Sequence, residues 1–308
     1  MMKRYGLIAL LVLLGLAWGI TMPLAKIAVS QGYRHFGLIF WQFVIAAVLL
    51  GAISIFRGRG LPMGGKQLRL YAIVALIGTI LPNSASYEAA RHLPSGVISI
   101  LMSTMPILAF PMALAMGIDR FSLLRLGGLA FGLVGVWLLI GPEASLPDRA
   151  MVAFIPLAII APAFYALEGN VVAKWGTYGC DAIQVLLGAS LIGAIATAPL
   201  ALMTGQWIDP TVPWGAPNWA LLFSAIIHAL AYSSYVWLVG RAGSVFAAQV
   251  SYLVTLFGIG WSMVLLSESY SSWIWLSLLL IFAGLFLVQP RTRESPLEGG
   301  STVSNNAD

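Results

Sequence analysis

Residues 6–28 read GLIALLVLLGLAWGITMPLAKIA, and this stretch decides the class of fold. Its only charged residue is Lys26. A helix needs roughly 20 mostly apolar residues to cross the hydrocarbon core of a bilayer, so the run is long enough to span it. Lys3 and Arg4 precede the run, as in a secretory signal. Because many similar runs follow, we interpret it as an uncleaved first helix.

The whole chain has the composition of a membrane protein. Apolar residues make up 60% of the 308 and charged residues 9%, whereas a soluble domain carries about 25% charged residues. We expect an all-α integral membrane protein with a disordered tail over 291–308. Apolar runs of spanning length predict ten transmembrane helices, at about 6–28, 36–56, 69–90, 95–117, 124–141, 151–173, 182–204, 218–239, 244–266 and 272–289.

The basic residues in the short loops predict the orientation of the bundle. An even number of spans places both termini on the same side. With a cytoplasmic N-terminus, four of the 16 Lys and Arg face outward, namely Lys26, Arg34, Arg91 and Arg149, and the other twelve face the cytoplasm. Cytoplasmic loops are enriched in these residues. We therefore predict that both termini are cytoplasmic and that the protein resides in the cytoplasmic (inner) membrane.

The two halves of the chain repeat each other weakly. At a shift of 148 residues Lys26 coincides with Lys174, and further matches are Ser86-Tyr87 with Ser234-Tyr235, Val97 with Val245 and Ser103 with Ser251. Each half has five predicted spans, an odd number, so the second half enters the membrane from the opposite side. The sequence predicts two inverted five-helix repeats, residues 1–145 and 146–290. Many secondary transporters have this arrangement, with the substrate site near the midplane between the repeats.

The repeated segments resemble the drug/metabolite transporter superfamily, and within it the EamA-type carriers of ten helices. The resemblance covers about residues 6–290 and rests on GLAWGITMPLAK (15–26), SYEAARHLPSGVISILMSTMPILAFPMALAMGIDRFS (86–122), GGLAFGLVGVWLLIGP (127–142), FYALEGNVVAKW (164–175) and VSYLVTLFGIGWSMVLLSESYSSWIWLSLLLIFAGLFLV (250–288). Asp119 and Glu268 close the fourth and ninth spans, as in that family. The chain departs from the family at Val254, where proline is usual, and at Gln42, where arginine is often found. The resemblance implies a carrier, whose cargo could be amino acids, nucleosides, cofactors or drugs.

Several other classes of protein are excluded. The one cysteine, Cys180, permits neither an intrachain disulfide nor a cysteine metal cluster, and three histidines on separate segments do not make a metal site. Residues 60–67 approach a phosphate-binding loop, but Gln67 replaces its Ser/Thr and the segment joins two membrane helices. The net charge of +5 is not gathered on one nucleic-acid-binding face. We therefore expect no cofactor, metal, nucleic-acid partner or catalytic residue.

Glu168 is the most informative charge within a predicted span. Residues three and four positions later are Val171 and Val172, and Lys174 lies on another face of the helix, so no local cation pairs with it. Its counterpart in the first half is Ile20, which shows that the repeat does not require a carboxylate here. Such a buried group can bind a substrate amine, carry a proton, or hydrogen-bond to a neighbouring helix.

Polar side chains recur at helical spacing in four predicted spans: Thr79, Asn83, Ser86 and Tyr87, then Tyr165, then His228, Tyr232 and Tyr235, and finally Gln249 and Tyr252. Such stripes predict a shared wet cavity with aromatic walls. Hydrogen bonds between helices are the alternative, each worth about 0.6 kcal/mol on average. We predict a substrate site made of Glu168, Tyr165, Asn83, Tyr87, His228, Tyr232, Tyr235, Gln249 and Tyr252.

Other residues receive structural interpretations. Lys26 and Lys174 lie at span ends, where long side chains reach the interface, and Glu88 is three residues from Arg91, which predicts a local pair. Pro106 and Pro111 are predicted hinges for alternating access. The motifs Gly15-xxx-Gly19 and Gly128-xxx-Gly132 favour close packing within the bundle over dimerisation, so we expect a monomer or a weak dimer.

Together these features predict a secondary carrier that works by alternating access, with export of neutral or aromatic amino acids as the leading hypothesis. Glu168 would then bind the substrate amine, and Asn83, His228 and Gln249 its carboxylate. The expected partners are a small-molecule substrate, membrane lipid and protons as the candidate coupling ion. Uptake or efflux of a nucleoside, cofactor or drug-like cation is the alternative, and a membrane enzyme or scaffold is a more remote one.

Overall fold

The computed structural model describes residues 2–140, 146–242 and 250–288, which form helices and contain no strand. The predicted all-α membrane fold is confirmed, while the count of ten spans and their orientation stay predictions. Six helical segments are long and apolar enough to span a membrane: Tyr5–Ser30, His35–Phe56, Gly65–His92, Ser95–Ala115, Arg149–Trp175 and Ala182–Met203. Shorter apolar helices follow at Leu123–Leu138, Val250–Leu266 and Ser272–Gly284.

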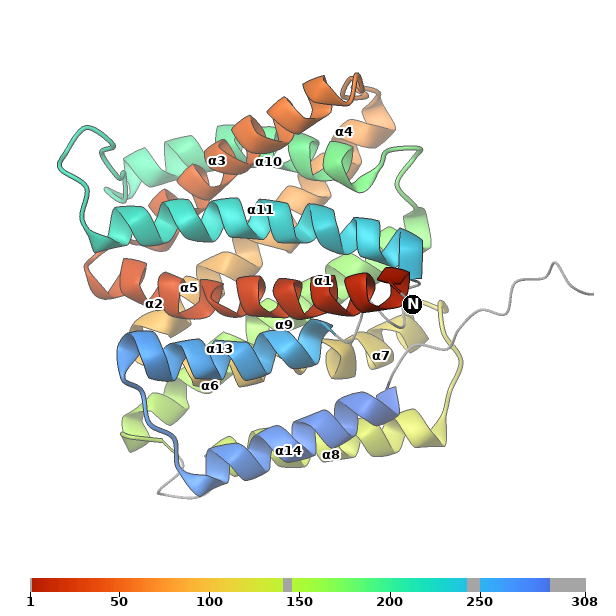
Figure 1. Cartoon of the computed structure of the whole chain (residues 1–308), viewed down its shortest axis with the longest axis vertical. Coiled ribbons are helices and arrows are strands. Elements are labelled where there is room, and N and C mark those ends of the chain that lie inside the picture. Colours follow the sequence, from red (N-terminus) through yellow and green to blue (C-terminus); the bar gives the residue numbers. More distant parts are fainter. Residues whose placement is uncertain (1, 141–145, 243–249, 289–308) are drawn as a thin grey trace, which may run out of the picture.

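The helices run back and forth along one direction, side by side (Figure 1). In the first half they are α1 (Met2–Gly19), α2 (Thr21–Ser30), α3 (His35–Phe56), α4 (Gly65–Ala75), the π-helix η1 (Leu76–Ile80), α5 (Leu81–His92), α6 (Ser95–Met102), α7 (Met105–Ala115) and α8 (Leu123–Ile140). In the second half they are the 3₁₀-helix η2 (Arg149–Phe154), α9 (Ile155–Trp175), α10 (Ala182–Met203), α11 (Ala216–Ala242), α13 (Val250–Leu266) and α14 (Ser272–Val288).

Helices of the two halves alternate within the bundle. The pairs α3 with α10, α1 with α13, α5 with α9, and α8 with α14 all pack side by side. Figure 1 shows α3 and α10 at one edge of the bundle and α8 and α14 at the opposite edge. Because every one of these pairs joins the two halves, the core between them is built from both.

Two glycines allow α1 to pack closely against α13. Gly15 and Gly19 on α1 face α13, where a Cβ at Gly19 would lie 2.8 Å from the backbone nitrogen of Gly258. A Cβ at Gly15 would likewise collide with the side chain of Leu253. The motif therefore serves packing within the chain, as predicted from the sequence.

Polar groups near the ends of the helices link neighbouring segments. Glu88 pairs with Arg91 at 2.7 Å, so the predicted local pair is confirmed. The ammonium group of Lys26 donates to the carbonyl oxygens of Ala90 and Leu93 at 2.6 and 3.0 Å. Lys174 donates to the carbonyl of Met116 at 3.0 Å. Both lysines thus satisfy carbonyl groups at segment ends, which adds a specific partner to their predicted reach toward the interface.

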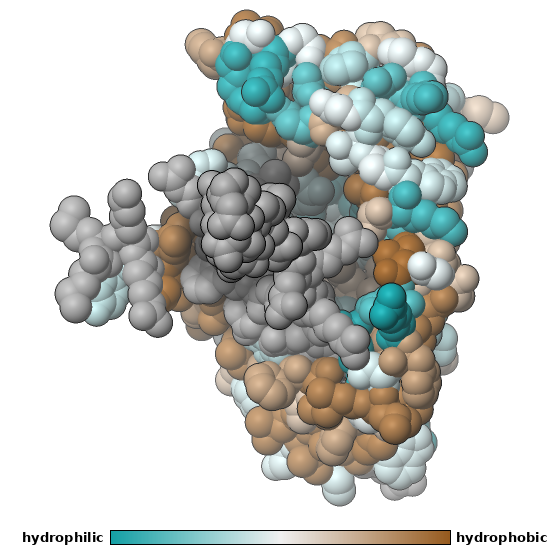
Figure 2. All heavy atoms as spheres, turned by 90° about the vertical axis from the view of Figure 1, so that its right-hand side faces the viewer, coloured by the Kyte–Doolittle hydropathy of each residue, from teal (hydrophilic) through white to brown (hydrophobic). Residues whose placement is uncertain are grey.

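The turn before α10 is held by a network around Asp181. The Asp181 carboxylate accepts a hydrogen bond from the backbone N–H of Gln184 at 3.0 Å, while the Gln184 side chain caps the backbone N–H of Asp181. Arg57 and Arg59, from the loop after α3, reach the same carboxylate at 2.8 and 3.0 Å. Figure 2 shows hydrophilic residues gathered near the top of this end of the bundle.

The charge of Asp181 gives a prediction for stability. Burial works to raise the pKa of the Asp181 carboxyl, but hydrogen bonds from the Gln184 backbone and Arg57 outweigh it and lower that pKa below 3.8. We expect Asp181→Ala to reduce the free energy of unfolding at pH 7 by about 1 kcal/mol, the usual cost of a lost helix cap. The difference should persist above pH 3.8 and shrink as the pH falls through the lowered pKa.

The measurement is thermal unfolding of the purified protein in detergent between pH 3 and 7. Asp209→Ala is the control, because Asp209 bonds only with Thr211 among the described residues, in an exposed loop. We expect the stability of that variant to match that of the parent protein, as is usual for surface substitutions away from packed features. An equal loss in both variants would contradict the role given to Asp181.

Candidate functional site

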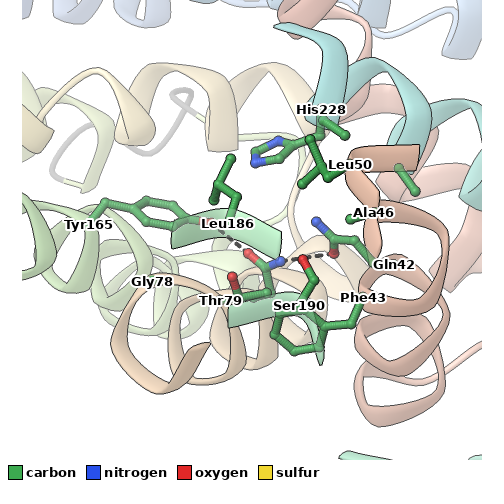
Figure 3. A pocket seen from close by; sticks show the side chains of 13 residues that line it. Gln42, Phe43, Ala46, Leu50, Gly78, Thr79, Tyr165, Leu186, Ser190 and His228 are labelled. Atoms are coloured by element: carbon green, nitrogen blue, oxygen red, sulfur yellow. Dashed lines mark hydrogen bonds between the residues drawn. The ribbon is translucent and has the colours of Figure 1, made fainter. Parts of the chain in front are cut away.

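A small cavity lies where α3, η1, α5, α9, α10 and α11 meet (Figure 3). Its polar lining comes from Gln42, Thr79, Asn83, Tyr165, Ser190 and His228. About 50 Å³ of its space admits water-sized molecules, whereas small-molecule sites usually enclose roughly 300–1,000 Å³. The cavity therefore holds a few water molecules in this conformation and must widen to hold a metabolite.

Asn83 on α5 is the centre of a hydrogen-bond network on the wall of the cavity. Its amide nitrogen donates to the side-chain oxygen of Gln42 on α3 at 3.0 Å. Its amide oxygen accepts from the hydroxyl of Tyr165 on α9 at 2.5 Å. The hydroxyl of Tyr87 also donates to the Gln42 oxygen, at 3.2 Å. Figure 3 shows the hydrogen bonds of Asn83 bridging three helices from both halves.

The π-helix η1 brings Gly78 to the edge of this cavity. Pro82 has no N–H, so it cannot donate to the carbonyl of Gly78 four residues earlier, and the regular helical ladder is interrupted there. The chain responds with a widened turn over Leu76–Ile80. Such π-turns inside helices occur frequently at functional sites.

Glu168 packs directly against Gly78. A Cβ added to Gly78 would lie 2.6 Å from the carboxyl carbon of Glu168 and 2.7 and 2.8 Å from its two oxygens. Only glycine at position 78 therefore lets the carboxyl group approach the backbone of η1 so closely. Gly78 itself lines the cavity, and Glu168 reaches its edge only through this contact.

Glu168 is partly buried and lies three residues after Tyr165 on the same helix face. The carboxyl group is within electrostatic range of the hydroxyls of Tyr165 and Tyr232. Among the residues that the structure describes, none donates a hydrogen bond to it and no cation pairs with it. The described part of the chain therefore agrees with the expectation that no nearby cation pairs with Glu168.

Of the other predicted site residues, His228 lines the cavity, while Tyr235 and Tyr252 are not among its lining residues. His228 packs near Trp18, with ring centroids 6.0 Å apart. Tyr235 packs near the same tryptophan, with ring centroids 5.7 Å apart. Tyr252 does not line this cavity, because its ring packs edge-on against Phe282 on α14 at 5.1 Å. Gln249 lies outside the described residues.

Pro106 and Pro111, the predicted hinges, both lie in α7, which follows a break in the helix. Helix α6 ends at Met102 and α7 begins at Met105, so Pro106 is the second residue after the break. Pro111 lies inside α7. Their hinge role stays a prediction.

Sequence reasoning did not propose Gln42, Ser190 or Trp18 for this region. Gln42 carried a usable signal, because it is the only amide in the otherwise apolar run 36–56. Ser190 had no such signal, since small hydroxyl residues occur commonly at helix contacts in membranes. Trp18 could not be separated from the tryptophans that gather at membrane interfaces.

An all-helical membrane bundle with a polar cavity between its halves is an architecture of membrane transporters. The sequence pattern of the EamA-like transporter family matches residues 6–141 and again 153–289. The chain therefore belongs to the EamA-like transporter family and is a membrane transporter. The resemblance inferred from the sequence is confirmed.

Individual relatives agree with this family. The chain is 25% identical over 291 residues to the "Uncharacterized transporter YvbV" of Bacillus subtilis (strain 168), covering 92% of each protein. It is 25% identical over 282 residues to the "Uncharacterized inner membrane transporter YedA" of Escherichia coli (strain K12), covering 88% of this chain and 86% of that protein. A solved protein structure superposes with a TM-score of 0.59 at 19% identity, over 90% of this chain and 95% of the other, which shows a shared fold.

The contact between Gly78 and Glu168 generates a prediction. Gly78→Ala should lower the free energy of unfolding by about 1–3 kcal/mol, because the added methyl group collides with the Glu168 carboxyl group. Gly169→Ala is the matched control, since a Cβ there meets nothing within 4 Å. That control should raise stability by about 0.5–1 kcal/mol, as Gly to Ala does inside a helix.

The measurement is a double-mutant cycle by thermal unfolding in detergent. In a Glu168→Ala background the cost of Gly78→Ala should disappear, because the colliding group has been removed. A cost that is unchanged in that background would mean that the carboxyl group does not occupy this position.

Proposed function

We propose that the protein is a secondary transporter of the cytoplasmic membrane that exports neutral or aromatic amino acids by alternating access. The observation that carries this proposal is the Glu168 carboxyl group, which lies against Gly78 at the edge of a cavity with tyrosine in its lining. A carboxylate inside the membrane is energetically costly, and the carboxylates that occur there usually mark substrate or ion pathways.

The proposed architecture is ten spans in two inverted repeats, residues 1–145 and 146–290, with both termini in the cytoplasm. Two matches of the family pattern, one in each half, support the repeat. The packing of α1 on α13 has a counterpart in the packing of α9 on α7, as a two-fold relation between the halves requires. Arg57, Arg59 and Lys174 support the orientation, because they fall at the end that the excess of basic residues assigns to the cytoplasm.

The chemistry of the site suits a zwitterion with an apolar side chain. The Glu168 carboxylate matches an ammonium group in sign, and the hydroxyl and amide groups around the cavity can serve a carboxylate. Tyr165, Tyr232 and the ring of His228 supply flat apolar surfaces for the side chain. Because the cavity is too small for an amino acid as it stands, the two halves must move apart at one end to admit it.

A drug-like organic cation is the second candidate. An acidic group next to tyrosine rings is a combination that also binds ammonium compounds, through charge attraction and the faces of the rings. Transport of phenethylamine in preference to L-phenylalanine would favour this candidate over amino acids.

Proton coupling through Glu168 gives a prediction that a transport assay can check. In liposomes, efflux of labelled L-phenylalanine by the parent protein should rise when a pH gradient is imposed with the acidic side outside, because inward proton flow would drive the export. Glu168→Gln should remove this response, because the amide cannot carry a proton. Exchange of labelled for unlabelled substrate should continue in this variant at a higher substrate concentration, because the amide also loses the charge that matches the substrate amine. Glu88→Gln is the control, since Glu88 is held by Arg91 near the end of α5.

The proposal fails in two recognisable ways. If the parent protein moves no labelled amino acid from a panel in either direction, the substrate class is wrong. If Glu168→Gln responds to the pH gradient as the parent protein does, Glu168 is not the proton carrier.

A further inference from the structure

Gln42 is the amide on the cavity wall whose side-chain nitrogen donates to no described residue. Its side-chain oxygen accepts two hydrogen bonds, from Asn83 and from Tyr87. No described residue accepts a hydrogen bond from its side-chain nitrogen, and the residue lines the cavity. Two N–H donors of Gln42 therefore remain for an occupant of the cavity.

Two tyrosines determine which way the amide of Gln42 points. The hydroxyl of Tyr165 donates to Asn83 and that of Tyr87 donates to Gln42, so both buried phenol protons have acceptors. Reversing both amides would turn these two oxygens into nitrogens and leave both protons without a described acceptor. An unsatisfied buried donor costs about 1–3 kcal/mol, so the reversed arrangement is disfavoured. The side-chain nitrogen of Gln42 is therefore the atom without a described hydrogen-bond partner.

The remaining polar lining also consists of groups that can donate. Thr79 and Ser190, which carry hydroxyl groups, also line the cavity (Figure 3). Both oxygen acceptors of the network, on Gln42 and Asn83, are already engaged. The cavity thus offers donors on this side, and such a surface fits an oxygen acceptor.

We propose that Gln42 binds a carboxylate or carbonyl oxygen of the substrate through its side-chain N–H groups, and that Asn83, Tyr87 and Tyr165 are positioning residues that hold it. This inference rests on the proposed function of the cavity as the substrate site. It favours Gln42 over Asn83 as the carboxylate ligand, because the Asn83 nitrogen already donates one hydrogen bond to Gln42, whereas both N–H groups of Gln42 remain. The Glu168 carboxyl group, which packs against Gly78, does not line the cavity in this conformation.

The test uses two probes that distinguish Gln42 from the Glu168 carboxyl group. The compound 3-phenylpropanoate has a carboxylate and no amine, and phenethylamine has an amine and no carboxylate. Calorimetric titration of the full chain in detergent measures the affinity of each probe. Gln42→Glu is nearly isosteric and keeps an oxygen for Asn83 and Tyr87, while it replaces the free donor by an acceptor. Gln67→Glu makes the same change away from the cavity, where the Gln67 side chain bonds the carbonyl of Tyr178.

We expect Gln42→Glu to weaken binding of 3-phenylpropanoate by about 10- to 100-fold, the scale of a hydrogen bond to a charged group. Binding of phenethylamine should not weaken, and Gln67→Glu should bind both probes like the parent protein. Tyr87→Phe should lower the ratio of acid to amine affinity, since it releases Gln42 from its orientation. Combined with Gln42→Glu, it should have no further effect on that ratio.

The proposal is overturned if the parent protein does not bind 3-phenylpropanoate, or if Gln42→Glu binds it equally well. Equal weakening of both probes by Gln42→Glu would also overturn it, because that result indicates a structural role. If liposomes transport no amino acid and yet 3-phenylpropanoate binding still depends on Gln42, the amino-acid function fails and the assignment of Gln42 stands.

Discussion

The hydrogen bonds of Asn83 satisfy a physical constraint that applies to the whole bundle. The core of a bilayer holds no water, so each polar group inside it must find a partner within the protein or line a wet cavity. Asn83 meets this constraint by binding Gln42 on α3 and Tyr165 on α9. The bond to Tyr165 joins the two halves of the chain beside the cavity. No described residue accepts a hydrogen bond from the side-chain nitrogen of Gln42 or donates one to the Glu168 carboxyl group.

Much of the fold could be predicted from the sequence, because helices that contact lipid must be apolar over their whole length. Long apolar runs indicate where helices lie, and the match of Lys26 with Lys174 indicates the repeat. Glu168 was predictable as a special residue since Val171 and Val172 occupy the positions where a cation would pair with it. The partnership of Gln42 with Asn83 was not predictable, because a polar stripe gives the face of a helix and not the neighbour that it meets. Tyr252 shows the same limit, as its ring meets Phe282 on α14.

A carboxylate at one end of the bundle also links the two halves. Glu268, in the segment after α13, accepts hydrogen bonds from the backbone N–H groups of Ser95 and Gly96 at 2.8 and 3.2 Å. This carboxylate satisfies the start of α6 in the other half, where the helix dipole also favours a negative charge. Under the proposed alternating access, a separation of the halves at that end would break these contacts.

The most direct test of the central claim, that the cavity between the halves is the substrate site, is protection of a cysteine placed in it. Cys180 is the only cysteine in the chain, so Cys180→Ser combined with Ser190→Cys gives a single reporter on the cavity wall. A water-soluble thiol reagent should modify this cysteine in the purified protein, and saturating L-phenylalanine should slow the modification. A cysteine at Ile195, which is 76% exposed on the outside of α10, should show no protection. Equal modification rates at position 190 with and without L-phenylalanine would contradict the claim that this cavity binds the proposed substrate.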